Sequence, residues 1–284
     1  GEGDLVSGAT CFSFGVPWTV GTRRAGPRPA AAVRVRRMGR TRKVAFGMTM
    51  GAFEDDIFSS PEEQRAYEEF CAAQERAEGF RLDRPALVCR WRMAGRRVPL
   101  LNRHIRALAQ RTVNGSALPT GVLSWAKQHV EWSLAEGDYP DPDGVLMLVI
   151  DVNGNAAMTV GAYEPLADTS REALRARAAE AHGEQAGTGV APELLCAVLD
   201  GTLYLGAGEG ESLCGAATLV EQLASTEGHR VVRAGADAVR DAAGAVLLVS
   251  DEHGVVPASE LASVDGEDAG FVRSLAQGVS KLFS

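Results

Sequence analysis

Hydrophobic residues in the first half of the chain recur with spacings that alternate between helix and strand periods. Segment 61–79 has apolar residues on one side of a helix rich in Glu and Gln, and segment 116–137 places Val122 and Trp132 near one apolar helix face. Segment 144–166 has two apolar runs around an Asn-Gly turn, which is typical of a β-hairpin. The predicted elements are a helix over 61–79, two short strands around a turn at Ala94 and Gly95, a helix over 102–114 that stops at an Asn-Gly pair, a helix within 116–137 and a hairpin over 144–166.

The second half continues this alternation of helices and strands. An alanine-rich helix is predicted to begin after Ser170 and to end in a glycine-containing segment before residue 190. Beyond it the pattern predicts a hairpin over 194–205, a helix over 216–228, a strand over 229–234, a short helix over 235–244 and a strand with an irregular end over 245–259. This order indicates an α/β fold. We expect a basic segment over 1–45, a smaller α/β domain over 46–165, a linker with a helix over 166–193 and a second domain over 194–284.

Length and composition allow a substantial core. The chain has 284 residues, of which 45% are hydrophobic, and it contains no uninterrupted run of eighteen apolar residues, so we expect no membrane span. The five cysteines are scattered and never form a CxxC pair, which favours neither a disulfide framework nor a zinc site. A reducing compartment fits this cysteine usage.

Charge is unevenly distributed along the chain. The net charge of -8 argues against a nucleic-acid-binding protein taken as a whole. Between Asp4 and Glu54, however, there is no acidic residue and there are many arginines, which resembles a plastid or mitochondrial transit peptide. A true start at Met38, a polyanion-binding arm and a solvated tail are the alternatives, and without targeting we expect a cytoplasmic protein.

Several residues that could carry chemistry have ordinary structural explanations. The glycines of Gly206–Glu211 lack dinucleotide-binding spacing, and the acids beside them would repel a phosphate. His104 and His129 lack a third ligand, so we predict no metal site. Cys214, at a predicted helix start, is either a dipole-stabilised thiolate or a packed, inert residue. The acids at 267 and 268 are expected in a surface loop.

Five segments in the same order resemble the fold-type IV pyridoxal-phosphate (PLP) family, which is the aminotransferase class IV family of branched-chain and D-amino-acid aminotransferases and aminodeoxychorismate lyases. Residues 91–108 look like the family's strand, turn and HxxRL helix, and residues 211–232 look like its LxGxTR helix and following strand. The other matches are 237–250, 254–257 and 263–270. The resemblance implies two α/β domains meeting at a cleft, with 194–284 as a remnant of the larger one, and a homodimer.

The resemblance also implies where the cofactor phosphate would bind. In the family, backbone amides at the start of the LxGxTR helix receive the phosphate, and the matching residues are Gly215, Ala216 and Ala217. The arginine of HxxRL, a second phosphate ligand, matches Ala107, with Arg106 one position away and about 100° around the helix.

The catalytic residues of the family are missing or shifted. The family needs a lysine for its Schiff base, and the chain has lysine only at positions 43, 127 and 281. The family's pyridine-nitrogen glutamate matches Gly189, with Glu193 out of register, and a neighbouring asparagine matches Leu194. Its phosphate-binding threonine matches Asp251, whose charge opposes a phosphate.

We therefore expect a degenerate class IV protein that binds no PLP, has lost PLP-dependent catalysis and acts as a binding or assembly partner. The first alternative is an active PLP-dependent transaminase or lyase that uses Lys127, which otherwise reads as a solvated helix residue. The second alternative is a polyanion-binding protein that acts through its basic N-terminal segment.

Overall fold

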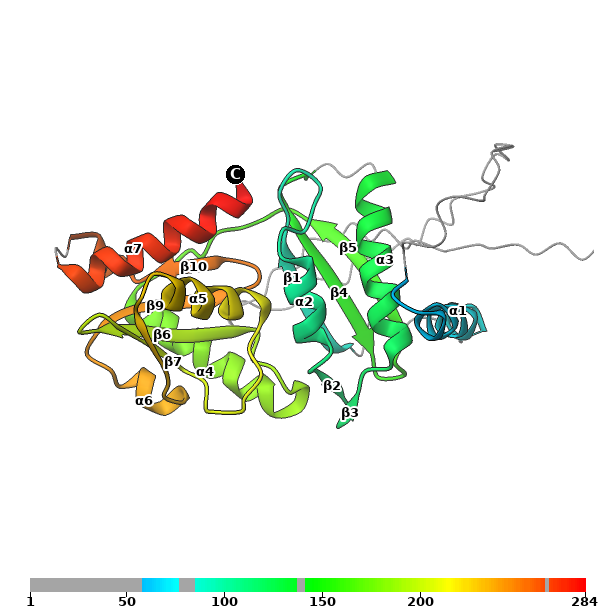
Figure 1. Ribbon diagram of the computed structural model, residues 1–284, viewed down its shortest axis with the longest axis horizontal. Coiled ribbons are helices and arrows are strands. Elements are labelled where there is room, and N and C mark those ends of the chain that lie inside the picture. Colours follow the sequence, from blue (N-terminus) through cyan, green and yellow to red (C-terminus); the bar gives the residue numbers. More distant parts are fainter. Residues whose placement is uncertain (1–57, 77–84, 137–140, 264–265) are drawn as a thin grey trace, which may run out of the picture.

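The computed structural model describes residues 58–76, 85–136, 141–263 and 266–284, and the predicted basic segment 1–45 lies outside them. The described residues form two α/β units, each around its own hydrophobic core (Figure 1). The mixed α/β class predicted from the sequence is confirmed.

The first unit is a three-stranded antiparallel sheet covered by helices, in the strand order β1-β4-β5. Side chains of α2 and α3 share one core with the sheet, and α1 packs on α3. The unit consists of α1 (Pro61–Arg76), β1 (Pro85–Arg92), α2 (Leu101–Leu108), β2 (Thr112–Val113), β3 (Ser116–Ala117), α3 (Thr120–Glu136), β4 (Val145–Asp151) and β5 (Ala156–Gly161).

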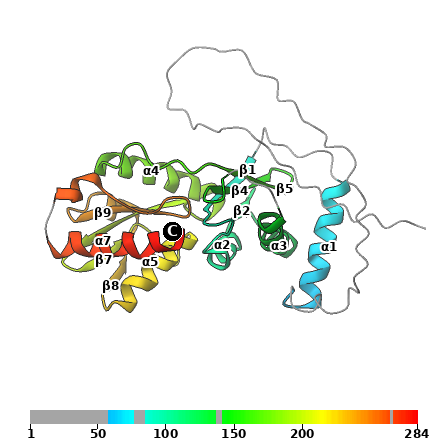
Figure 2. The same cartoon turned by 90° about the horizontal axis from the view of Figure 1, so that it is seen from above.

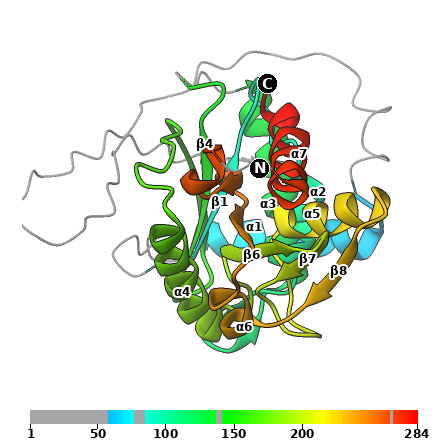
Figure 3. The same cartoon turned by 90° about the vertical axis from the view of Figure 1, so that its left-hand side faces the viewer.

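The second unit is a five-stranded sheet in the order β10-β9-β6-β7-β8, antiparallel except for β7 and β8. Helices α5 and α7 cover one face, and α4 and α6 cover the other (Figures 2 and 3). Its elements are α4 (Arg171–Thr188), β6 (Glu193–Leu199), β7 (Thr202–Leu205), α5 (Gly215–Thr226), β8 (Arg230–Arg233), α6 (Ala236–Arg240), β9 (Ala245–Ser250), β10 (Gly254–Pro257), η1 (Ser259–Ser263), α7 (Glu267–Ser280) and η2 (Lys281–Phe283).

Three local predictions for the first unit need correction. The second strand expected after β1 is only a single bridge between Ala94 and Arg97. The helix expected over 102–114 ends at Leu108, and the residues that follow form the β2–β3 hairpin, in which Asn114 and Gly115 make the turn with positive φ angles. Trp132, expected on the apolar face of α3, is 43% exposed.

The second unit also differs from the prediction in three places. Segment 166–193 is more than a linker, since α4 packs on β6 and β9. The single strand expected over 245–259 is the β9–β10 hairpin. Asp268 is part of the first turn of α7, and its carboxylate accepts hydrogen bonds from the amides of Asp200 and Gly201 at 3.0 and 2.8 Å. It therefore ties α7 to the β6–β7 turn rather than lying free in a loop.

Candidate functional site

The start of helix α5 is one of the places where the two units meet. Helix α2 of the first unit packs against α5, and Arg103 of α2 donates hydrogen bonds to Thr218 at 3.0 Å and to Gln222. The three residues predicted to bind a cofactor phosphate, Gly215, Ala216 and Ala217, form the buried first turn of α5. The sequence therefore located this helix start correctly.

A carboxylate of the chain itself already occupies this helix start. The Ala216 amide donates a 2.7 Å hydrogen bond to Oδ1 of Asp251, which lies in the turn between β9 and β10. Free amides and the helix dipole make such a position a binding site for an anion. Here the anion is the Asp251 side chain, which is 9% exposed.

The other contacts of Asp251 come from the first unit. Its Oδ2 lies 3.2 Å from Nδ1 of His104, and its carbonyl oxygen accepts a hydrogen bond from the Arg92 amide at 2.9 Å. Burial alone would raise the pKa of the Asp251 carboxyl, but His104, the Ala216 amide and Arg111 together hold this pKa below its ordinary value. Asp251 is therefore an ionised, buried residue at neutral pH.

Gly215 allows α2 to approach this close to α5. A Cβ atom at position 215 would lie 2.5 Å from Nδ1 of His104 and 3.1 Å from its backbone nitrogen. The His104 ring is fixed on its other side by Trp91, which stacks on it at 5.2 Å between ring centroids. His104, predicted to have no metal-binding role, is thus the buried neighbour of Asp251.

The residues at this site do not fit the phosphate of PLP. A phosphate on the Ala216 amide would meet the Asp251 carboxylate at contact distance, and the two anions would repel each other. Lys127, the candidate for a Schiff base, is a half-buried residue of α3, whereas the Asp251 carboxylate contacts a side chain of α2 and a backbone amide of α5. Lys281 lies in η2, and Lys43 lies outside the described residues.

Arg106, the other predicted phosphate ligand, lies on a different side of α2. It is exposed and lines a groove with residues of α3, whereas Ala107 is buried in the core. The direction of Arg106 is about 200° around the helix from that of His104. The structure therefore does not bring Arg106 together with the start of α5.

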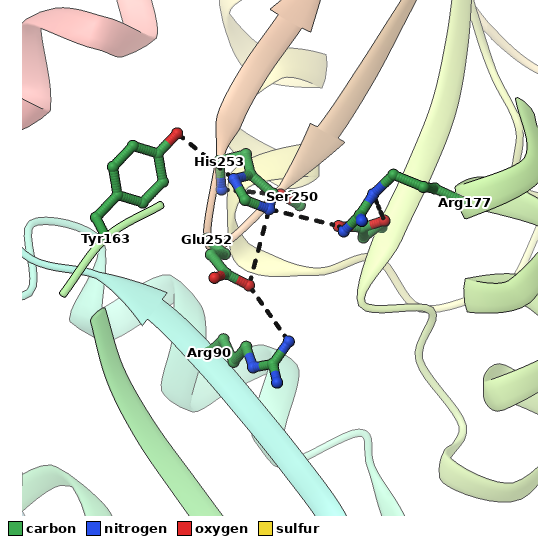
Figure 4. A network of polar contacts seen from close by, with 7 residues as sticks. Arg90, Tyr163, Arg177, Ser250, Glu252 and His253 are labelled. Atoms are coloured by element: carbon green, nitrogen blue, oxygen red, sulfur yellow. Dashed lines mark hydrogen bonds and ion pairs between the residues drawn. The ribbon is translucent and has the colours of Figure 1, made fainter. Parts of the chain in front are cut away.

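A second polar cluster also crosses the junction between the units (Figure 4). Arg90 of β1 forms an ion pair with Glu252 at 3.7 Å, and Arg177 of α4 binds Glu193 of β6 through two nitrogens at 2.5 and 3.0 Å. His253 lies between these pairs, with Nε2 3.8 Å from Glu252 and 3.9 Å from Glu193. We call these five residues the junction cluster.

The imidazole of His253 is neutral in this cluster. Burial, together with the charges of Arg177, Arg90 and Arg92, lowers the pKa of His253 to about 4. Its backbone amide donates to Oγ of Ser250 at 2.9 Å, and its Nδ1 lies 3.5 Å from the hydroxyl of Tyr163. The predicted cleft between the units is therefore crossed by these polar contacts.

Sequence reasoning missed the junction cluster, although a signal was present. Asp251, Glu252 and His253 follow directly on strand β9, in which every residue is buried. Three ionisable residues after such a strand indicate a polar site at the strand's end. The family motif places Glu193 only out of register with the family's acid, and nothing in the local sequence points to Arg177, 16 residues away, as its partner.

Cys214 and the glycine-rich segment Gly206–Glu211 have structural roles only among the contacts that the structure describes. Cys214 is 1% exposed at the start of α5, and burial raises the pKa of its thiol well above the ordinary value, so it is a packed residue. Gly206–Glu211 forms a loop in which Glu211 accepts a hydrogen bond from the Gly208 amide at 2.8 Å.

Among the described residues, no group of three or more His, Cys, Asp or Glu could hold a metal ion. Within the same ranges, no helix is long and apolar enough to cross a membrane.

Comparisons with known proteins give structural likenesses only. No family model and no curated protein matches the chain. Similar solved structures include a fold IV transaminase from Curtobacterium pusillum, with 14% identity, a TM-score of 0.44 and coverage of 73% of this chain and 91% of that one. A branched-chain amino acid aminotransferase mutant from Thermobaculum terrenum has 14% identity, a TM-score of 0.44 and coverage of 74% and 89%. An aminotransferase from Brucella abortus, described with PLP bound, has 13% identity, a TM-score of 0.41 and coverage of 68% and 88%. These structures bear the names of the family that the sequence resembles, and at such identities and TM-scores the likeness carries no activity over to this chain.

Proposed function

We propose that this chain is a class IV aminotransferase-like protein that has lost PLP-dependent catalysis and serves as a binding or assembly partner. The observation that carries the proposal is the hydrogen bond from the Ala216 amide to the Asp251 carboxylate. The sequence supports it independently, because no lysine occurs between residues 128 and 280. The family resemblance supports a homodimer as the assembly.

Binding of PLP at the start of α5 would require Asp251 to leave. Its carboxylate would have to break the contacts with the Ala216 amide and with His104, both inside the protein. Removing one partner of a buried charged contact costs about 3–5 kcal/mol. The contacts of a bound phosphate would have to be more favourable than this cost for PLP to bind at the start of α5.

The test is whether the protein forms a Schiff base with PLP. Purified protein is incubated with PLP, reduced with borohydride and examined for stoichiometric incorporation of the cofactor, in the wild type, in Lys127→Ala and in the matched variant Lys281→Ala. We expect no stoichiometric incorporation in any of the three proteins. Low labelling that falls equally in both variants is the signature of reaction with surface amines.

The active-enzyme alternative predicts a different pattern. Stoichiometric incorporation in the wild type that disappears in Lys127→Ala and persists in Lys281→Ala would overturn the proposal. It would make Lys127 the catalytic lysine of a transaminase or lyase, and would place the cofactor beside α3 rather than at the start of α5.

A further inference from the structure

A groove of about 720 Å³ lies on the first unit, between the loop after β1, helix α2 and the second half of α3. Val98, Leu100, Val130 and Leu134, four buried apolar residues, contribute to its lining. Its charged lining residues are Arg96, Arg97, Arg103, Arg106 and a single acid, Glu131. The groove therefore combines apolar walls with a positive charge excess.

Three of the four arginines of the groove, namely Arg97, Arg103 and Arg106, form no ion pair with a carboxylate of the described residues. Arg103 donates to the uncharged side chains of Thr218 and Gln222. Arg97 and Arg106 are exposed, and neither forms an ion pair with a carboxylate in the part of the chain that the structure describes. By contrast, Arg177 binds a carboxylate directly. Apolar walls beside Arg97 and Arg106, which lack a carboxylate partner within the described ranges, strengthen the attraction of these two charges for an anion.

The loop that carries two of these arginines is held in a fixed shape. Gly95 and Arg96 have φ angles of 53° and 62°, and Ala94 and Arg97 exchange backbone hydrogen bonds across this turn. The Gly95 amide donates to the Asp143 carboxylate at 2.8 Å. A two-residue turn of this kind needs a positive φ at both central residues, so the turn itself accounts for the left-handed conformation of Arg96 and fixes the backbone from which Arg97 projects.

We propose that this groove binds a small organic phosphate, whose phosphate contacts Arg97 and Arg106 and whose organic part lies against Val130 and Leu134. Planar guanidinium groups suit phosphate because each can donate two parallel hydrogen bonds. The volume is in the range of small-molecule sites, which is about 300–1,000 Å³. A nucleic acid is the weaker candidate, since the arginines are confined to one groove of a chain with a net charge of -8.

The groove shares Arg103 with the contact between α2 and α5, but its two proposed phosphate ligands, Arg97 and Arg106, take no part in the contacts of Asp251, so this proposal does not depend on the proposed loss of catalysis. Arg106 projects from α2 on a different side from His104, the neighbour of Asp251. Binding of a phosphate that carries no aldehyde also requires no lysine. The two proposals can therefore fail independently.

The experiment is titration calorimetry of the full chain with AMP, inorganic phosphate, citrate and a short single-stranded RNA. The proteins are the wild type, the double variant Arg97→Gln/Arg106→Gln, and Arg230→Gln as the matched control. Arg230 is equally exposed but lies on β8 of the other unit. Circular dichroism verifies that the variants are folded.

We expect AMP to bind the wild type more tightly than inorganic phosphate or citrate does. The double variant should lose about tenfold or more in affinity for AMP, because two charge-assisted contacts are removed, whereas Arg230→Gln should remain within about twofold. Equal binding by citrate, no binding of AMP, tighter binding of RNA than of AMP, or unchanged affinity in the double variant would each overturn the proposal.

Discussion

Asp251 is held by contacts from both units of the molecule. Its carboxylate accepts from the Ala216 amide and lies beside His104, and its carbonyl oxygen accepts from the Arg92 amide. The Asp251 carboxylate thus satisfies a free amide and interacts with the helix dipole, as a bound anion would at a helix start. The negative charge is therefore the property that matters, since an amide of the same shape satisfies the helix dipole less well.

The substitution Asp251→Asn tests whether the negative charge of Asp251 stabilises the fold. We expect the free energy of unfolding at pH 7 to fall by about 2 kcal/mol, because the Ala216 amide and His104 then face a neutral amide, and a hydrogen bond to a charged group becomes a weaker one to an uncharged group. The pKa of Asp251 is below its unfolded value of about 3.9, so its stabilisation is present above that pH and is lost as the pH falls through the folded pKa.

Urea denaturation at pH 7 and at pH 3 measures both effects. The difference in free energy of unfolding between the wild type and Asp251→Asn should be larger at pH 7 than at pH 3. Asp200→Asn is the control, since Asp200 is exposed in a turn where asparagine is equally favourable. Equal stability of Asp251→Asn and wild type at pH 7 would contradict the role given to the carboxylate.

Among the helices and strands, those with strong local signals were predictable from the sequence. Helix α4 begins after Ser170, whose hydroxyl accepts from the Ala173 amide, and ends at Gly189 with a φ of 82°. The β6–β7 hairpin turns at Asp200 and Gly201, both with positive φ. Here one short stretch of sequence determines the local structure.

Contacts between distant segments could not be predicted in this way. The start of α5 was located from local sequence, but its partner Asp251 is 35 residues away and His104 belongs to the other unit. Helix α7 is absent from the sequence prediction, although its apolar residues Phe271, Val272, Leu275 and Val279 have helical spacing. Local periodicity predicts elements, whereas tertiary packing determines which polar groups meet.

Gly215→Ala tests the close packing of α5 on α2. The new Cβ atom would lie 2.5 Å from the His104 ring, which Trp91 prevents from moving freely. We expect a loss of about 1–3 kcal/mol in the free energy of unfolding, as is usual for overpacking.

Gly183→Ala is the matched control for this substitution. Gly183 lies within α4, and a Cβ atom there meets nothing within 4 Å. It should therefore increase stability by about 0.5–1 kcal/mol, because alanine favours the helix. Thermal denaturation of both variants measures the contrast. A stabilising Gly215→Ala would show that α2 and α5 are not packed as described.

At the scale of the whole molecule, the two units are joined by polar contacts from several elements. The junction cluster connects β1 of the first unit to α4, β6 and the β9–β10 turn of the second. Nearby, Arg92 lies over the ring of Tyr163 at 3.1 Å from its centroid. Because His253 and Glu193 are largely buried between these charged groups, a change in the charge of one of them affects the stability of the whole junction.

The neutral imidazole of His253 makes this junction sensitive to acid. Its pKa of about 4 lies below the value of about 6.5 in the unfolded chain, so between these two values the unfolded state binds a proton that the folded state excludes. Stability from His253 is therefore present above pH 6.5 and is lost as the pH falls toward 4. The loss can reach about 3 kcal/mol, since each pKa unit corresponds to about 1.4 kcal/mol.

His253→Gln should remove this acid sensitivity while leaving a neutral side chain at the junction. Denaturant unfolding at several pH values from 4 to 7 measures the slope of stability against pH in the wild type, in His253→Gln and in His182→Gln, where the replaced histidine is exposed on α4. The slope should be shallower in His253→Gln alone. This window lies above the one in which Asp251 titrates, so the two effects are separable. If all three proteins lose stability equally between pH 6.5 and 4, His253 does not make the junction acid-sensitive and other groups account for the loss.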